Sequence, residues 1–490
     1  MTFFAIFASK SEPQQQPREK SGASAGTLDV SKEEKWEQIE QIDLSFLPIP
    51  DYTPGTDEEK RLVRKIDLYL LPTIFMMYLL SYLDRTNIGN AKTAGMEVDL
   101  DLSSTQYSTV LVVMIVFYVS MEIPTNMILS KSRPSIFLPA IMILWGTVTA
   151  SMSQVKTYHQ MVACRALVGI FEAGFAPGVL LMFSSWYRRS EQAMRFGIYI
   201  SAPVLSGAFG GLFAGAITGH LDGVRGMAGW RWLFLIEGVG TVGIAFMAFF
   251  TLLDFPSKSR YMSDRERDLA LTRLKYESLL NSNTDHTDMT HSKALKKALI
   301  NWRTWLFTLG YAIINTTSSQ SYFYPTLVKS LGYSGTKIQY MTVPIYAVAF
   351  VFNISTSYFG DRHIQNHRGH FISCCMVIVC LTGILTTTVY NNTARYIFLI
   401  FMCAAVWCAT SSCLAFASSS FGYLEREARG ISLATMNGLG TASTIAGSFL
   451  FPAKDSPKYI MGFSVVSATS FLGIAIFLLL AFLIKRYPGN

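Results

Sequence analysis

Long apolar segments separated by short polar ones run along most of this chain. A helix needs about 20 apolar residues to cross the roughly 30 Å hydrocarbon core of a bilayer, and we find twelve segments of that kind. We therefore expect an all-α membrane protein with twelve transmembrane helices. The expected spans are 67–88, 105–129, 135–153, 159–186, 197–219, 232–254, 304–327, 338–358, 370–389, 395–420, 428–451 and 460–484.

Two long polar segments interrupt this pattern. Residues 1–65 are rich in Ser, Glu, Gln and Pro, which is typical of a disordered cytoplasmic tail. Residues 255–303 form the one long interior connection, and their charges suggest surface helices of a cytoplasmic linker. This linker divides the chain into an N-terminal six-helix half, 66–254, and a C-terminal six-helix half, 304–485, followed by a short tail, 486–490.

The composition supports a membrane protein. Half of the residues are hydrophobic and only 15% are charged, whereas soluble domains carry about 25% charged residues. The mean hydropathy is +0.31. The net charge of +8 fits a cytoplasmic face held against anionic lipid. We expect no nucleic-acid partner, because the sequence contains no soluble basic domain. All seven cysteines fall in apolar segments, where they act as small hydrophobic residues, so we expect neither a cofactor nor a metal.

Basic residues predict the orientation of the spans. They precede the first span, as at Lys65, and follow even-numbered spans, as at Arg133 and Arg188. The connection after the first span is acidic, with Glu97 and Asp99. Because cytoplasmic loops are enriched in Lys and Arg, both termini are expected in the cytoplasm. The plasma membrane is the favoured location, and a vacuolar or another internal membrane is the alternative.

Two polar clusters lie inside the apolar segments. Asp84 and Arg85 are adjacent near the end of the first span, and Arg165 and Glu172 lie seven residues apart in the fourth, on one helical face. A charge at mid-bilayer depth costs about 2.5–3.5 kcal/mol on insertion scales, so such residues usually line a bundle interior or a transport pathway. We interpret them as a substrate and proton site of a membrane transporter.

Three stretches of the chain resemble a known family. Residues 82–88 (Tyr-Leu-Asp-Arg-Thr-Asn-Ile) and 165–178, with Arg165, Gly169, Glu172, Gly174 and Pro177-Gly178, resemble first-span and fourth-span motifs of the anion:cation symporter family of the major facilitator superfamily. Fungal allantoate, nicotinate, biotin and pantothenate permeases belong to that family. Gly360, Asp361 and Arg362, with Arg368 beyond, resemble the gating-loop signature that is found across the superfamily.

The resemblance implies roles for the four charged residues. It makes Glu172 a proton-coupling carboxylate, Asp84 a second protonation site and Arg85 the positioning partner of Asp84. Arg165 is the main candidate for binding an anion, because a guanidinium matches a carboxylate bidentately. For each residue, a structural ion pair between helices remains the alternative.

Further polar side chains in the spans are candidates for contacts to the substrate, although packing between helices is the alternative for each. Glu237, at the start of the sixth span, is expected to pair with Arg231. The candidate contact residues, which together with Arg165 and Arg85 make up the predicted substrate site, are Tyr82, Asn315, Gln320, Trp407 and Asn437.

The function that we expect is secondary transport. A proton-coupled symporter, which we expect to be a monomer, would import a small organic anion such as a vitamin or ureide carboxylate by alternating access. An efflux carrier for a secondary metabolite and a nutrient receptor without transport are the alternatives. No nucleophile or metal-binding motif occurs in the spans, so we do not expect an enzyme.

Overall fold

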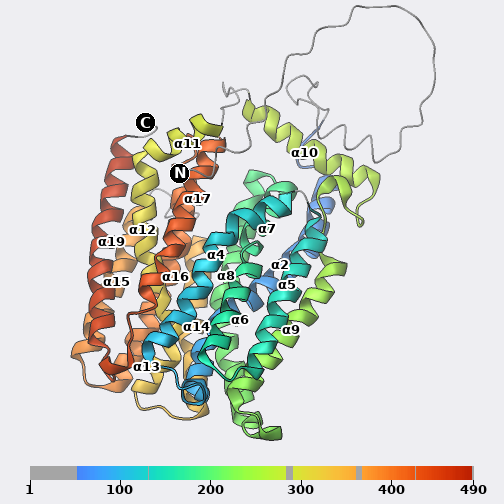
Figure 1. Cartoon of the computed structure of the whole chain (residues 1–490). Coiled ribbons are helices and arrows are strands. Elements are labelled where there is room, and N and C mark those ends of the chain that lie inside the picture. The colour runs from blue at the N-terminus through green and yellow to red at the C-terminus, as the bar shows by residue number, and fades with distance from the viewer. Residues whose placement is uncertain (1–51, 131, 283–290, 360–366, 425, 488–490) are drawn as a thin grey trace, which may run out of the picture. The chain divides into compact units, whose positions relative to one another are not determined.

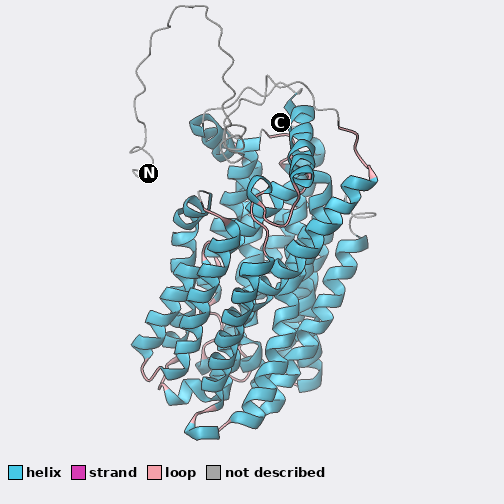
Figure 2. Ribbon diagram, turned by 90° about the vertical axis from the view of Figure 1, so that its right-hand side faces the viewer, coloured by secondary structure: helices cyan, strands magenta, loops and turns pink. Residues whose placement is uncertain are grey.

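The computed structural model describes residues 52–130, 132–282, 291–359, 367–424 and 426–487. In this part of the chain the regular secondary structure is helical throughout, as Figure 2 shows. Ten of the described helices are long and apolar enough to cross a membrane. The predicted N-terminal tail, apart from its last residues, and the end of the C-terminal tail lie outside the described residues.

The helices of the first predicted half follow the expected spans closely. The first begins earlier than expected because Thr56 caps it, accepting a hydrogen bond from the amide of Glu59 at 3.3 Å. The helices are α2 (Asp57–Ala91), α4 (Ser104–Ser130), α5 (Pro134–Ser151), α6 (Tyr158–Glu172), α7 (Phe175–Trp186), α8 (Arg189–Leu221) and α9 (Gly229–Thr251).

Two spans of the second predicted half are each divided into two helices. The expected span 304–327 consists of α12 (Trp302–Ser318), a 3₁₀ turn (Ser319–Phe323) and α13 (Tyr324–Ser330). The expected span 428–451 consists of α17 (Arg426–Ala442) and α18 (Thr444–Gly447). The two interruptions lie together, since the hydroxyl of Ser443 donates to the carbonyl of Ala312 at 2.7 Å. The unbroken helices of this half are α14 (Thr336–Phe359), α15 (Arg368–Thr388), α16 (Asn392–Ser420) and α19 (Ile460–Arg486).

Two helices of the connection between the halves attach to different halves. Helix α10 (Asp264–Ser282) packs against α2 and α7, whereas α11 (His291–Ile300) packs against α12 and α17. Both lie at the same end of the helix bundle, at the top of Figure 1. We call this the linker end and the opposite one, where α2 ends and α4 begins, the far end.

Four buried or half-buried charged residues hold α10 to the first half. Arg273 of α10 lies 2.9 Å from Glu59 of α2 and 2.6 Å from Glu191 of α8. Arg188 lies 3.2 Å from Glu59 and 3.4 Å from Glu191. We call these four residues the linker cluster. Tyr52 also donates a 2.5 Å hydrogen bond to Glu59, and burial together with this bond raises the pKa of Tyr52 to about 12.

Helices α8 and α14 form the broadest contact between the halves. One face of α8 carries a glycine every fourth residue, and a Cβ at each would lie within 3.1 Å of a side chain of α14. The absence of side chains therefore allows the two helices to approach closely. The pairs are Gly207 with Tyr346, Gly211 with Thr342, Gly215 with Tyr340 and Gly219 with Thr336.

Large apolar side chains remain exposed on the outer helices. Phe246 and Phe250 of α9 and Phe471 and Phe482 of α19 are each at least 60% exposed. In a bilayer these side chains would contact lipid, which is as apolar as they are. The exposed apolar surface therefore agrees with a multi-pass membrane protein.

Candidate functional site

The last turns of α2 carry the polar residues around which the site is built. Asp84 and Arg85 are consecutive and therefore point in directions about 100° apart on the helix. Asp84 faces α5 and α6, where it meets Trp145 and Arg165. Arg85 faces the end of α6, where it meets Glu172.

Glu172 and Arg85 form an ion pair. The Nε of Arg85 lies 2.8 Å from Oε1 of Glu172, and the hydroxyl of Ser81 donates to the same oxygen. Glu172 is completely buried, while the Arg85 side chain is 16% exposed. The sequence placed Arg165 and Glu172 on one face and paired Arg85 with Asp84, but the structure pairs Arg85 with Glu172. Helix α6 ends at Glu172, and this carboxylate contacts Arg85 of α2 instead of Arg165, which lies two turns earlier on α6.

Aromatic rings surround Arg85 where the two halves meet. Its guanidinium lies 4.4 Å from the ring centroid of Tyr118 and 5.8 Å from that of Tyr82. The Tyr82 ring packs edge-on against Trp407 of the second half, with 5.8 Å between centroids. Arg85 is therefore the partly exposed cation beside the contact between Tyr82 and Trp407, both of which the sequence proposed as substrate contacts.

Asp84 and Arg165 lie deeper in the first half, and both are 2% exposed. The indole of Trp145 donates to Oδ2 of Asp84 at 3.1 Å, and Nη1 of Arg165 donates to the main-chain carbonyl of Asp84 at 3.3 Å. Oδ1 of Asp84 and Nε and Nη2 of Arg165 have no hydrogen-bond partner among the described residues. These two side chains are thus close, but their charged groups are incompletely paired.

Glu237 is a third buried carboxyl that the sequence analysis did not place in the site. It is 6% exposed, and the side-chain amide of Asn87 donates to its Oε1. The expected pairing with Arg231 is wrong, since Arg231 donates to the carbonyls of Ser153 and Val155, both at 2.8 Å. Six residues on a helix correspond to directions about 120° apart, a signal that argues against the expected pair.

These residues form what we call the five-charge site: Asp84, Arg85, Arg165, Glu172 and Glu237. When all are ionised, three carboxylates face two guanidinium groups and one negative charge is in excess. A net charge in a low-dielectric interior is costly, and one bound proton removes it. The site can therefore hold a proton without introducing a positive charge into the bundle.

The other predicted contact residues are more widely distributed. Asn315 donates from its side chain to the carbonyl of Tyr311 one turn earlier at 3.0 Å. Gln320 is 1% exposed, and neither side-chain amide atom has a hydrogen-bond partner among the described residues. Asn437 is half-buried in α17. Among the described residues, no hydrogen bond or ion pair joins these three side chains to the five-charge site, and their role in binding stays a prediction.

The predicted gating loop is only partly described. Gly360, Asp361 and Arg362 lie outside the described residues, so the signature is not tested. Arg368, at the start of α15, donates to the carbonyl of Ala415 at 2.8 Å.

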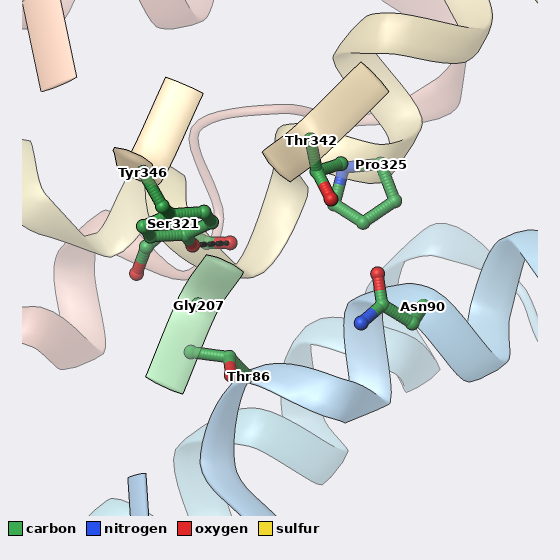
Figure 3. Close-up of a pocket in the computed structure, with 7 residues that line it drawn as sticks. All are labelled: Thr86, Asn90, Gly207, Ser321, Pro325, Thr342 and Tyr346. Atoms are coloured by element: carbon green, nitrogen blue, oxygen red, sulfur yellow. Dashed lines mark hydrogen bonds between the residues drawn. The ribbon is translucent and has the colours of Figure 1, made fainter. Parts of the chain in front are cut away.

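A small cavity lies between the two halves (Figure 3), and the sequence did not predict it. Its empty volume is about 210 Å³. Tyr346 donates to the carbonyl of Ser321 at 3.3 Å across one side. Thr86, the residue after Arg85, and Asn90, about 1.4 turns beyond Arg85, bring α2 to the cavity. The lining residues are Thr86, Asn90, Gly207, Ser321, Pro325, Thr342 and Tyr346.

Hydrogen bonds join the halves at the far end. The Gln339 side chain donates to the carbonyl of Asn90 at 3.1 Å, and Tyr107 donates to that of Tyr322 at 3.3 Å. The hydroxyl of Ser108 donates to the carbonyl of Ser448 at 2.7 Å. The structure is therefore closed between the halves at the far end.

Comparison with known proteins identifies the family. The family model of the Major Facilitator Superfamily matches residues 74–452. The chain is 35% identical over 416 residues, 82% of each chain, to the MFS transporter prlL of Fungal sp. (strain NRRL 50135). It is 30% identical over 443 residues to the high-affinity nicotinic acid transporter of Saccharomyces cerevisiae, covering 89% of this chain and 79% of that one. The chain therefore belongs to the major facilitator superfamily.

The solved structures agree on the fold. A bacterial homolog to the human lysosomal transporter Spinster superposes with a TM-score of 0.63 at 15% identity, covering 88% of this chain and 98% of that one. The protein is thus an integral, multi-pass membrane transporter and not an enzyme. The similarity to the nicotinic acid transporter agrees with the anion:cation symporter resemblance of the two span motifs.

Proposed function

We propose that this transporter is a proton-coupled symporter that imports a small organic anion by alternating access. The observation that carries the proposal is the Arg85–Glu172 ion pair beside the contact between the halves. A guanidinium held by a carboxylate is released when that carboxylate takes up a proton. The high-affinity nicotinic acid transporter among the relatives supports a carboxylate as the substrate class.

The proposed cycle starts from competition for Arg85. While Glu172 is ionised, it occupies the Nε side of the guanidinium. Protonation weakens this contact, and the free donors can then bind a substrate carboxylate bidentately. Tyr82 and Trp407 would pack against the body of the substrate. In this scheme Arg85 binds the anion first, and Arg165 holds the main chain of Asp84 in place.

Charge balance then favours movement of the loaded protein. A proton neutralises the excess negative charge of the five-charge site, and the substrate anion is matched by a released guanidinium. The two six-helix halves, 66–254 and 304–485, would rock about the contact of α8 with α14. A membrane potential of 100 mV contributes about 2.3 kcal/mol per net charge moved, so it assists import whenever more protons than negative charges travel.

The orientation proposed from the basic residues makes the linker end cytoplasmic. With both termini on that side, the hydrogen-bonded far end faces outward, and the structure represents a state closed to the outside. We place the protein in the plasma membrane as a monomer, because import of a nutrient anion requires a carrier there and each chain holds a complete five-charge site.

The test is uptake into proteoliposomes, beginning with labelled nicotinate and a panel of small carboxylic acids. An inward proton gradient should accelerate uptake of a substrate. Glu172→Gln should remove this acceleration, while Glu58→Gln, which changes an exposed carboxyl at the start of α2, should retain it. Arg165→Lys reports on the deeper guanidinium.

The outcomes separate the alternatives. Unchanged proton dependence in Glu172→Gln would remove this residue from the coupling role. Transport of the labelled acid only in the direction that corresponds to export from the cytoplasm would indicate an efflux carrier. Saturable binding without counterflow of labelled substrate would indicate a receptor without transport.

A further inference from the structure

A chain of hydrogen bonds leads from Glu237 to the other half. The Asn87 amide donates to Oε1 of Glu237, and the Asn90 amide donates to Oδ1 of Asn87 at 2.7 Å. The carbonyl of Asn90 accepts from Gln339 of α14 at 3.1 Å, and Gln339 also donates to Thr93 at 3.0 Å. The first four side chains are all at most 6% exposed, so solvent does not compete strongly for these bonds.

The protonation state of Glu237 determines what this chain can do. An ionised carboxylate only accepts hydrogen bonds, so Asn87 must present its NH₂ group to Glu237 and its oxygen to Asn90. A protonated carboxyl carries one donor. That donor can bind the oxygen of Asn87, which then competes with the Asn90 amide for the same acceptor. A proton on Glu237 would therefore weaken the hold of Asn87 on the Asn90 side chain, and Asn90 is the residue whose main-chain carbonyl accepts from Gln339.

The chain of hydrogen bonds ends beside the cavity between the halves. Asn90 and Thr342, which follows Gln339 by three residues, both line the cavity between the halves (Figure 3). A change in the Asn90 side chain would therefore alter the lining of this cavity.

Charged and polar groups of several elements lie around the network that contains Glu237. Helix α2 presents Asp84 and Asn87, and α6 presents Arg165, the cation that interacts with Glu237 electrostatically. Helix α5 contributes Trp145, which donates to Asp84, and α8 contributes Gly210 beside Asn87. On the π-helical turn Lys92–Met96, Lys92 pairs with Glu97 at 3.5 Å.

We propose that Glu237 is a positioning residue whose protonation opens the closure between the halves at the far end, acting through Asn87, Asn90 and Gln339. The inference rests on the proposed proton-coupled transport, but it assigns a separate role. Glu172 would control the anion-binding guanidinium, whereas Glu237 would control access from the far end.

The test measures opening without any substrate. Ser108 is buried at the far end and donates across the halves, so Ser108→Cys should react with a membrane-impermeant maleimide only when that end opens. Labelling of the otherwise native chain provides the background. Because maleimides react with the thiolate, whose fraction falls with the pH, each rate is divided by that of Ser103→Cys, an exposed position at the same end. This relative rate should rise as the pH falls, approaching about tenfold per pH unit where one proton controls opening.

Variants in the Ser108→Cys chain identify the controlling group. Glu237→Gln should abolish the pH response and Glu237→Asp should retain it, with a matched far-end control, Asp101→Asn, unchanged. If Glu237→Gln fails to fold, Gln339→Met breaks the same chain from the other half and should also abolish the response. A wild-type pH response in folded Glu237→Gln or in Gln339→Met would overturn the proposal, as would a pH-independent rate of Ser108→Cys relative to the exposed Ser103→Cys.

The failure of this inference is distinguishable from failure of the proposed function. Arg85→Lys should weaken uptake of the labelled acid at low concentration yet keep the pH response of labelling. A pH response that Glu237→Gln removes, in a protein that shows no proton-driven uptake, would uphold the role of Glu237 and reject symport.

Discussion

The linker cluster and the five-charge site use the same chemical groups in different proportions. In the linker cluster, Glu59 and Glu191 each lie within 3.4 Å of both Arg188 and Arg273, so two carboxylates match two guanidinium groups. In the five-charge site, three carboxylates share two guanidinium groups and one ion pair, Arg85–Glu172, forms among the described residues. Balanced charges fasten helices together, whereas an excess carboxylate leaves a place for a proton.

The largest expected effect concerns the balanced cluster. Arg273→Met would leave two buried carboxylates facing one cation, and breaking a buried pair in this way costs about 3–5 kcal/mol. Thermal unfolding in detergent should show a strongly lowered midpoint. Lys296→Met, on the exposed side of α11, should leave the midpoint unchanged. If Arg273→Met instead altered the pH dependence of uptake and not stability, the assignment of the cluster as a fastener would be wrong.

The next effect concerns the five-charge site and binding. Arg85→Lys keeps the charge but loses the fork that binds a carboxylate bidentately. We expect KM for a transported acid to rise by about 30-fold, equivalent to about 2 kcal/mol, while the unfolding midpoint changes little. Uptake kinetics checks this. A KM within twofold of the wild-type value would place the anion elsewhere, with Arg165 the first alternative.

A smaller effect should follow from the indole beside Asp84. Trp145→Phe retains the ring packing but removes the hydrogen bond to Oδ2 of Asp84, a loss of about 1–2 kcal/mol for a bond to a charged acceptor. Because Asp84 is then less able to stay ionised, we expect the pH profile of uptake to shift toward higher pH. A lowered unfolding midpoint with an unchanged profile would make Asp84 a structural residue.

The smallest effect concerns a pair at the linker end. Burial acts to raise the pKa of Glu266, but hydrogen bonds from Lys65 and Ser263 lower it below its usual range. A lowered folded-state pKa adds stability above the unfolded pKa of about 4.3, and this stability is lost as the pH falls. Glu266→Gln should therefore lower the unfolding free energy by about 0.5 kcal/mol at pH 7, with the difference vanishing near pH 3.

Hydropathy was sufficient to predict an all-helical membrane protein, because spanning a bilayer requires length and apolar composition. It did not predict where spans break: the expected span 159–186 is divided into α6 and α7, and two spans of the second half are divided as well. The run Thr316–Ser321 consists of Thr, Ser and Gln and is followed by Pro325, a pattern that favours local hydrogen bonding over a continuous helix. The two breaks in the second half are stabilised by contact with each other, which only the tertiary structure supplies.

The candidate site was predictable as a list of charges but not as a set of pairs. Asp84, Arg85, Arg165 and Glu172 stand out because charges are costly in apolar segments. Their partners depend on how α2, α6 and α9 pack, and spacing along one helix does not determine that. Glu237 was passed over because a nearby arginine in the sequence suggested a partner that faces another direction.

The glycine face of α8 extends for twelve residues, or about 18 Å along the helix. A surface without side chains has no ridges that interlock with a neighbour, so α14 can tilt against it with few steric barriers. Replacing one of these glycines by alanine would add a methyl group that pushes α14 away from α8 at that position. We expect the rate of transport to change with substitutions at these four positions, which leave every residue of the five-charge site unaltered.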